Sequence, residues 1–198
     1  MNNNPPIQVA YGWDRDETKF MSTAIRYLNR PGYALRPLAD WSHMFLVFRF
    51  ADGTAEIHEA LTRTGWSKKP AVEFANWLAA DPVNRHGEIH WLPIDSPVVE
   101  QIYQESLSWV GHRAYDFRQI VAFAVADSLL GRVFGFHVGS GSSGVFCSEG
   151  ACQIVGERSR RWDLRQYPDE RWDTIVPQAA YNSFMWRMNR LMNDLERE

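Results

Sequence analysis

The chain has 198 residues, a formal net charge of -3, and 45% hydrophobic against 23% charged residues. These proportions are typical of a folded globular protein and exclude fibrous and intrinsically disordered classes. The small acidic excess argues against a nucleic-acid partner, and the longest apolar run, residues 120–126, is far shorter than the roughly 20 residues that cross a bilayer.

We expect a single domain over residues 1–198, because at this length roughly 70% of the unfolded chain's surface can be buried without disulfide or metal staples. Cys147 and Cys152 lie five residues apart in a predicted helix, so their side chains diverge and no mutual disulfide is expected. Reduced thiols, together with an N-terminus that lacks a basic and apolar leader, lead us to expect a cytoplasmic location.

The first half of the chain predicts alternating helices and strands. Apolar spacing predicts a helix over 18–28 that ends at Arg30-Pro31-Gly32. The stretch 44–50 predicts a buried strand that returns in a hairpin with 54–61. Further elements are expected in this order: a helix at 71–80, a strand at 87–94, and a helix at 97–110 capped by Ser96.

The second half is predicted to be mainly helical. Residues 116–130 are apolar enough for a buried helix, and the Gly and Ser run 139–144 predicts a loop that leads to Cys147. An amphipathic helix at about 179–197 closes the chain, with an apolar stripe of Phe184, Met188, Leu191 and Leu195. That stripe is expected to face the core, with a partner groove as the alternative. The elements together predict an α+β fold in which a small antiparallel sheet packs against helices.

Cys147 is the residue best placed to carry chemistry. At a helix N-terminus the free backbone N–H groups and the helix dipole favour a thiolate, which is a nucleophile. The same N–H groups can hold the oxyanion that forms when a thiolate attacks a carbonyl. The alternative is that Cys147 is a small buried hydrophobic residue, as free cysteines often are. Cys152, deeper in the same apolar run, is expected in the core.

A cysteine nucleophile needs an imidazole base and a group that orients it. Of the six histidines, His43 directly precedes the apolar strand, whose sheet would hold the ring at the mouth of a cleft. His86 and His90 flank Glu88, but no third ligand follows at zinc spacing, so no metal site is expected.

The length of the hairpin loop decides which residue shares a face with His43. A two-residue loop, 52–53, places His43 on the face of His58, whereas a three-residue loop, 51–53, places it on the face of Glu59. The spacing alone leaves both alternatives open.

Several segments, taken in chain order, resemble the permuted papain-like hydrolases, which are the YiiX and YaeF type relatives of the NlpC cysteine peptidases and of the lecithin–retinol acyltransferases. They are 20–28, 41–47, 57–60, 111–117 and 146–149. The last, Phe-Cys-Ser-Glu, is the most specific. In that family the histidine strand precedes the cysteine helix, the reverse of papain's order. The resemblance covers about residues 20–155 and implies a circularly permuted papain-like (NlpC-like) fold.

The resemblance implies that Cys147 is the nucleophile, His43 the general base and Glu59 the group that orients the imidazole. It also implies that Tyr115 forms a wall of the active site or donates a hydrogen bond there. We expect both Tyr115 and Ser148 to contact substrate. We favour Glu59 over the alternative histidine because a carboxylate both orients and stabilises an imidazolium. We therefore expect a thiol hydrolase of amide or ester bonds that works through an acyl-enzyme, without a cofactor, on a small-molecule, peptide or lipid acyl substrate. The alternatives are an acyltransferase on the same site and a non-catalytic binding module that retains the fold.

Overall fold

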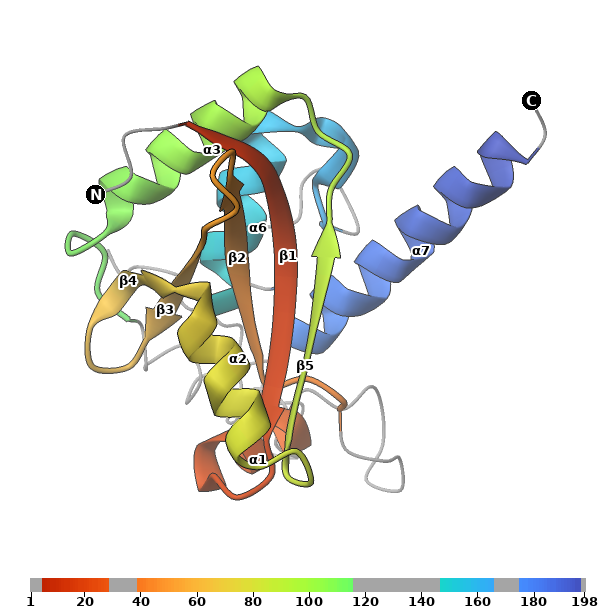
Figure 1. Cartoon of the computed structure of the whole chain (residues 1–198). Coiled ribbons are helices and arrows are strands. Elements are labelled where there is room, and N and C mark those ends of the chain that lie inside the picture. Colours follow the sequence, from red (N-terminus) through yellow and green to blue (C-terminus); the bar gives the residue numbers. More distant parts are fainter. Residues whose placement is uncertain (1–4, 29–38, 116–146, 166–174, 197–198) are drawn as a thin grey trace, which may run out of the picture.

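The computed structural model of the chain describes residues 5–28, 39–115, 147–165 and 175–196. These residues form one five-stranded antiparallel sheet with helices on both faces (Figure 1). The predicted α+β class with an antiparallel sheet is therefore confirmed. The helix predicted at 116–130 and the loop predicted at 139–144 lie outside the described residues, as does the predicted end of the first helix.

The sheet has the strand order β4-β3-β2-β1-β5. The predicted hairpin is present as β2 (His43–Phe50) and β3 (Ala55–Leu61). The strand predicted at 87–94 is β5 (Arg85–Trp91), which begins two residues earlier and ends three residues earlier. Two strands were not predicted, namely β1 (Pro6–Asp16) and the edge strand β4 (Gly65–Pro70).

The sequence of strand β1 does not alternate between apolar and polar residues, because β1 is an interior strand of the sheet. Every residue from Val9 to Trp13 is buried, since both faces of the sheet are covered there. A strand buried on both faces has an apolar run in place of an alternating pattern. The enrichment of residues 7–13 in β-branched and aromatic side chains is the signal that could have identified it.

The described helices follow the predicted ones closely. They are α1 (Phe20–Leu28), α2 (Ala71–Ala80), α3 (Ser96–Trp109), α6 (Cys147–Arg158), the short η1 (Arg160–Trp162) and α7 (Pro177–Leu195). The bounds of α2 are those predicted. Asp95, and not the predicted Ser96, is the N-cap of α3, because the backbone of Asp95 is extended whereas Ser96 is already helical.

The two faces of the sheet carry separate apolar clusters. Helix α2 covers one face, where Phe74 packs with Phe45, Val47 and Ile57. Helices α3 and α6 and the first half of α7 cover the other face with the larger cluster, in which Cys152 is fully buried (Figure 1). Strand β2, which begins with His43, therefore packs against apolar side chains on both of its faces.

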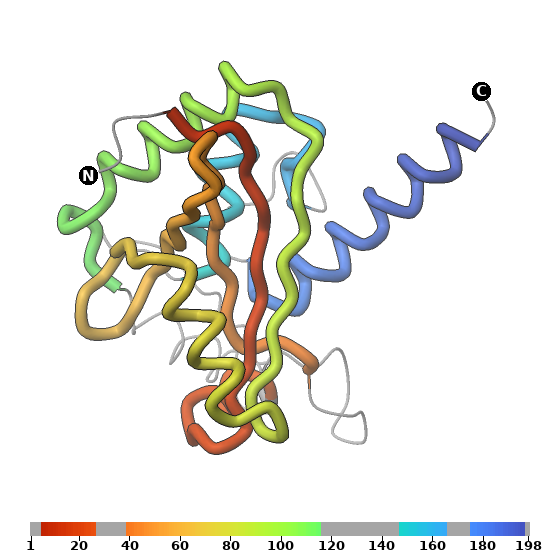
Figure 2. The backbone as a smooth tube through the Cα atoms, viewed as in Figure 1, coloured from red at the N-terminus to blue at the C-terminus, as the bar shows by residue number. Residues whose placement is uncertain are grey.

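The apolar stripe of α7 faces the core only in its first half. Phe184 is fully buried, and Met188 and Leu191 are partly buried against the larger cluster, but Leu195 is 59% exposed. Figure 2 shows the reason, since the C-terminal half of α7 leads away from the sheet. The expectation of a core-facing stripe is thus correct for Phe184 and wrong for Leu195.

Candidate active site

The β2–β3 hairpin is closed by a three-residue loop. The backbone N–H of Phe50 donates to the carbonyl of Thr54 at 2.9 Å, and that of Gly53 donates to the carbonyl of Phe50 at 3.0 Å. Gly53 has a φ of +84°, a left-handed conformation that glycine adopts without a side-chain penalty. Of the two loop lengths considered from the sequence, the structure has the longer one.

This register places His43 and Glu59 together and His58 apart from them. Leu46 lies directly opposite His58, and side chains alternate between the faces along each strand. His43 and Glu59 therefore share one face, while His58 points to the other. The Nε2 atom of His43 lies 2.9 Å from Oε2 of Glu59. Of the two alternatives for the orienting group, Glu59 is the one that contacts His43.

The Glu59 carboxylate has a cation on each side. Its side chain is only 4% exposed, and its Oε1 atom lies 2.5 Å from Nζ of Lys69. Burial alone would raise the pKa of Glu59, but the hydrogen bonds to His43 and Lys69 and their positive charges lower that pKa to about 2. Glu59 is therefore an anion at neutral pH and can orient and stabilise an imidazolium.

Cys147 is the first residue of α6, as expected for a thiol at a helix N-terminus. Its side chain lies close to that of His43, and the two groups interact electrostatically. Because Glu59 contacts Nε2 of His43, Nδ1 is the ring nitrogen left for the thiol. Cys147 is only 3% exposed, so a substrate carbonyl must displace neighbouring groups to reach the sulfur.

The charges around His43 favour its protonated form. Burial by itself lowers the pKa of His43, but the negative charges of Cys147 and Asp14 and the hydrogen bonds to Cys147 and Glu59 outweigh it. The net pKa of His43 is raised well above its ordinary value. The imidazolium form of His43 places a positive charge beside the thiol of Cys147, and a thiolate is the form in which a cysteine attacks a carbonyl.

Asp14 and Lys69 are site residues that the sequence patterns did not identify. Asp14 lies directly opposite His43 in the β1–β2 register, and burial raises the pKa of its carboxyl while the charge of His43 lowers it. Lys69 belongs to β4. Both lie on the two strands that were not predicted. The run Lys68-Lys69-Pro70 after Trp66 is a weak signal for an edge strand.

Tyr115 and Ser148, the two predicted substrate contacts, lie in different surroundings. Tyr115 is partly buried and packs against the larger apolar cluster. Ser148 is fully buried, and its hydroxyl donates to the carbonyl of Ile175 at 2.6 Å. That bond ties α6 to the segment that precedes α7 and uses the hydroxyl proton. What Ser148 can still offer a substrate oxygen is its backbone N–H, which lies in the first turn of α6.

A second polar network lies under the opposite face of the sheet. The Nδ1 atom of His58 lies 2.7 Å from Oγ of Ser106, which accepts from Nε1 of Trp66 at 3.1 Å, and Nε2 of His58 is 3.5 Å from Glu56. Because the ionised Glu56 carboxylate can only accept, the proton of the neutral ring lies on Nε2 and points toward Glu56. Nδ1 is then an acceptor, and the Ser106 hydroxyl donates to it. The order Ser, His, Glu resembles a hydrolase triad. Ser106 and His58 are both fully buried, however, so the network has a structural role.

His86, Glu88 and His90 lie on the edge strand β5. Glu88 accepts a hydrogen bond from His90 at 2.9 Å and another from the hydroxyl of Tyr181 at 3.1 Å. In the part of the chain that the structure describes, no group of three or more potential ligands lies close enough to hold a metal ion.

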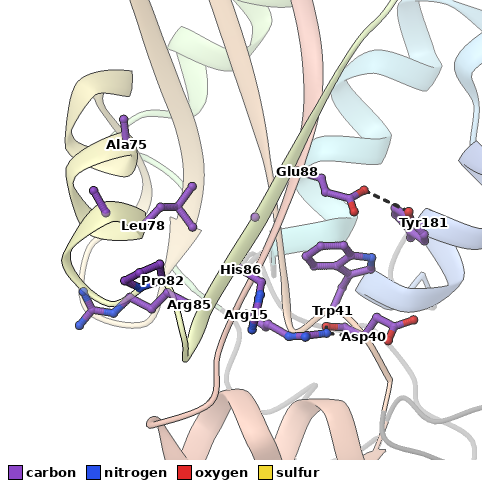
Figure 3. A pocket seen from close by; sticks show the side chains of 12 residues that line it. Arg15, Asp40, Trp41, Ala75, Leu78, Pro82, Arg85, His86, Glu88 and Tyr181 are labelled. Carbon is purple, nitrogen blue, oxygen red and sulfur yellow. Dashed lines mark hydrogen bonds and ion pairs between the residues drawn. The ribbon is translucent and has the colours of Figure 1, made fainter.

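A groove of about 750 Å³ runs along the edge strand β5. Figure 3 shows Leu78 and Pro82 on one side of the strand and Trp41 and Tyr181 on the other. The residues that line it include none of the predicted catalytic residues. Trp41 lies two residues before His43, so the groove adjoins the strand end that carries the imidazole without containing the thiol.

Comparison of the sequence with protein-family models gives no matching family, and a search of curated proteins gives no matching relative. Among the described helices, none combines the length and the apolar character needed to cross a membrane.

Proposed function

We propose that this chain is a thiol hydrolase of the permuted papain-like class, which cleaves an amide or ester bond through an acyl-enzyme on Cys147. One observation carries this proposal: His43 is hydrogen-bonded to the buried anion Glu59 and interacts with Cys147, which lies at the start of a helix. A nucleophile, a base and an orienting group thus occur in the order that covalent catalysis requires. The chain order, with the histidine strand before the cysteine helix, supports the permuted arrangement.

In the first half of the reaction the Cys147 thiolate attacks the carbonyl carbon of the substrate. The oxygen of that carbonyl becomes an oxyanion, which the free N–H groups in the first turn of α6 can hold. The His43 imidazolium then donates its proton to the departing amine or alcohol as the bond to the carbonyl carbon breaks. A thioester on Cys147 remains, and His43 is neutral.

In the second half neutral His43 takes a proton from water, and the hydroxide formed attacks the thioester carbonyl. The carbon–sulfur bond breaks, the carboxylic acid leaves, and the thiolate and imidazolium pair is restored. Glu59 stays ionised throughout, because its pKa of about 2 lies far below neutral pH. Its charge holds the ring in place and stabilises the imidazolium on each occasion that it forms.

A second candidate is an acyltransferase, in which an amine or alcohol replaces water. The observation that favours it is the 3% exposure of Cys147, since a shielded thioester meets little water. A non-catalytic module that retains the fold would show the same burial, but it would have no need for a buried carboxylate bonded to the imidazole. The two free cysteines support the proposed cytoplasmic location.

The proposal is tested by turnover of a panel of acyl esters, acyl amides and short peptides, with a thiol-directed acylating probe in parallel. We expect wild type and Cys152→Ala to react with the probe and to turn over the same substrates, while Cys147→Ala does neither. Cys152→Ala is the matched control because it removes the other thiol of the same helix. A wild-type protein that neither reacts with the probe nor turns over any member of the panel contradicts the proposal. Added amine or alcohol acceptors separate transfer from hydrolysis through the product formed.

A further inference from the structure

Lys69 lies against the Glu59 oxygen that His43 does not use. Nζ of Lys69 is 2.5 Å from Oε1, while Nε2 of His43 is 2.9 Å from Oε2. The carboxylate is nearly buried, at 4% exposure, whereas the lysine side chain is 32% exposed. Glu59 is therefore fixed between two cations, one inside the site and one at its rim.

The β3–β4 register explains why Lys69, and not its neighbour, reaches Glu59. Lys69 lies opposite Ile57, and residues 57 and 59 of one strand share a face. Lys68 points to the other face, where its Nζ atom lies 3.2 Å from Glu56. Two adjacent lysines thus serve two different carboxylates, which provides a matched control for removing one positive charge.

The charges that face His43 show what Lys69 does. Asp14 faces it from β1, Glu59 from β3 and Cys147 from α6, and all three are anions when ionised. Lys69 supplies the opposing positive charge through Glu59. Lys19 acts on Asp14 as well, but Lys69 is the lysine that contacts Glu59. Without Lys69, the imidazolium would lie among carboxylates with one cation fewer, and it would hold its proton more tightly.

The positive charge of Lys69 matters most after the acyl group has been transferred to Cys147. The thioester carries no charge on sulfur, so the groups left around the ring are Asp14, Glu59 and Lys69. His43 must be neutral at that point to take a proton from water or from an acceptor. A ring that stays protonated cannot act as a base.

We propose that Lys69 is a positioning residue that fixes Glu59 and offsets its charge, so that His43 can lose its proton for the deacylation step. This inference rests on the proposed function. Lys69 contacts neither the nucleophile nor the acyl group in this scheme and acts through Glu59.

The test compares Lys69→Met with Lys69→Arg and with Lys68→Met as the matched control. The first readout is the NMR titration of the His43 ring in protein labelled at histidine, assigned by its loss in His43→Ala. We expect Lys69→Met to move the His43 midpoint up by about half to one pH unit, whereas Lys69→Arg and Lys68→Met leave it near wild type. Lys69→Gln is the substitute if the methionine variant does not fold.

The second readout compares the rate of acylation, seen as a burst of the first product, with the rate of deacylation. We expect Lys69→Met to slow deacylation about three- to tenfold at neutral pH and to move its pH profile upward, while the acylation burst persists. A His43 midpoint and a deacylation profile that both match wild type overturn the role of Lys69. Because the NMR titration needs no substrate, it tests Lys69 even if wild type shows no turnover, an outcome that would contradict the proposed function alone.

Discussion

His43 and Glu59 are 16 residues apart in the chain, yet their Nε2 and Oε2 atoms lie 2.9 Å apart. They meet because a three-residue loop sets the register of the hairpin between them, and a loop one residue shorter would turn Glu59 to the opposite face. One backbone turn therefore decides whether the imidazole has a carboxylate partner.

Cys147 should be alkylated well before Cys152. Cys147 begins α6 and lies beside His43, whereas Cys152 is fully buried with its sulfur 3.8 Å from that of Met44. We expect at least about a tenfold difference in rate at neutral pH, because the thiolate is the reactive form. Limited treatment with iodoacetamide followed by peptide mapping measures it. Modification of Cys152 first would show that the reactive thiol is misassigned.

His43→Ala should lower turnover about as much as Cys147→Ala, because members of one nucleophilic unit do not act additively. Glu59→Gln should retain the fold and lose less, about ten- to a hundredfold, since the amide keeps a hydrogen bond but not the charge. Steady-state kinetics on a substrate from the panel provide the measurement. The contrary pattern is near-normal activity in Glu59→Gln together with complete loss in His58→Gln.

Glu59 should make the folded state sensitive to acid. Its pKa is about 2 in the folded protein, against an ordinary value of 4.5, so below pH 4.5 the unfolded chain binds the additional proton. The stabilisation is complete above about pH 4.5 and is lost as the pH falls toward 2, by about 3 kcal/mol for a group this buried. Urea unfolding between pH 6 and pH 3 measures it. Glu59→Gln should show a flatter profile over that range, and an identical profile would contradict the assignment.

Ser106→Ala should destabilise the fold without affecting the reactivity of Cys147. It removes the partner of His58 Nδ1 and of Trp66 Nε1, both buried, at a cost of about 1–3 kcal/mol. The midpoint of thermal or urea unfolding gives the loss, and the alkylation rate of Cys147 at a temperature where both proteins are folded is the control. Slower alkylation of Cys147 in the folded variant would link this network to the site after all.

His58 should lower the stability of the folded state below about pH 6.5. Burial lowers the pKa of His58 in the folded protein, so the unfolded chain takes up the proton first as the pH falls. The contribution of neutral His58 is complete above its ordinary pKa and is lost below it. Comparing the free energy of unfolding of wild type and His58→Gln at pH 8 and pH 5.5 isolates this effect, and the difference between the two proteins should shrink at the lower pH.

Local patterns were enough to predict much of the fold. The apolar stretch before Asp52 and Gly53 predicts β2 and its return strand, and the bounds of α2 are those that its composition predicts. Cys147 was expected at a helix start and begins α6. These features depend on the periodicity of neighbouring residues and on the residues that favour turns, and short stretches of sequence determine both.

The register of the site was beyond such patterns. The sequence allowed either Glu59 or His58 beside His43, because the number of residues in a loop depends on which backbone groups pair, and Phe50 and Thr54 pair only in the folded sheet. A shift of one residue changes no local propensity, but it turns every side chain of the strand to the other face.

Asp14 and Lys69 were decided by the tertiary structure alone. Asp14 faces His43 from β1, and Lys69 reaches Glu59 from β4, two strands whose own sequences carry weak signals because one is buried on both faces and the other is a short edge. The charges that set the protonation of His43 come from strands far apart in the chain. Coulombic interactions depend on distance in space and on burial. Both are fixed only when the strands have paired, so they cannot be read from the linear sequence.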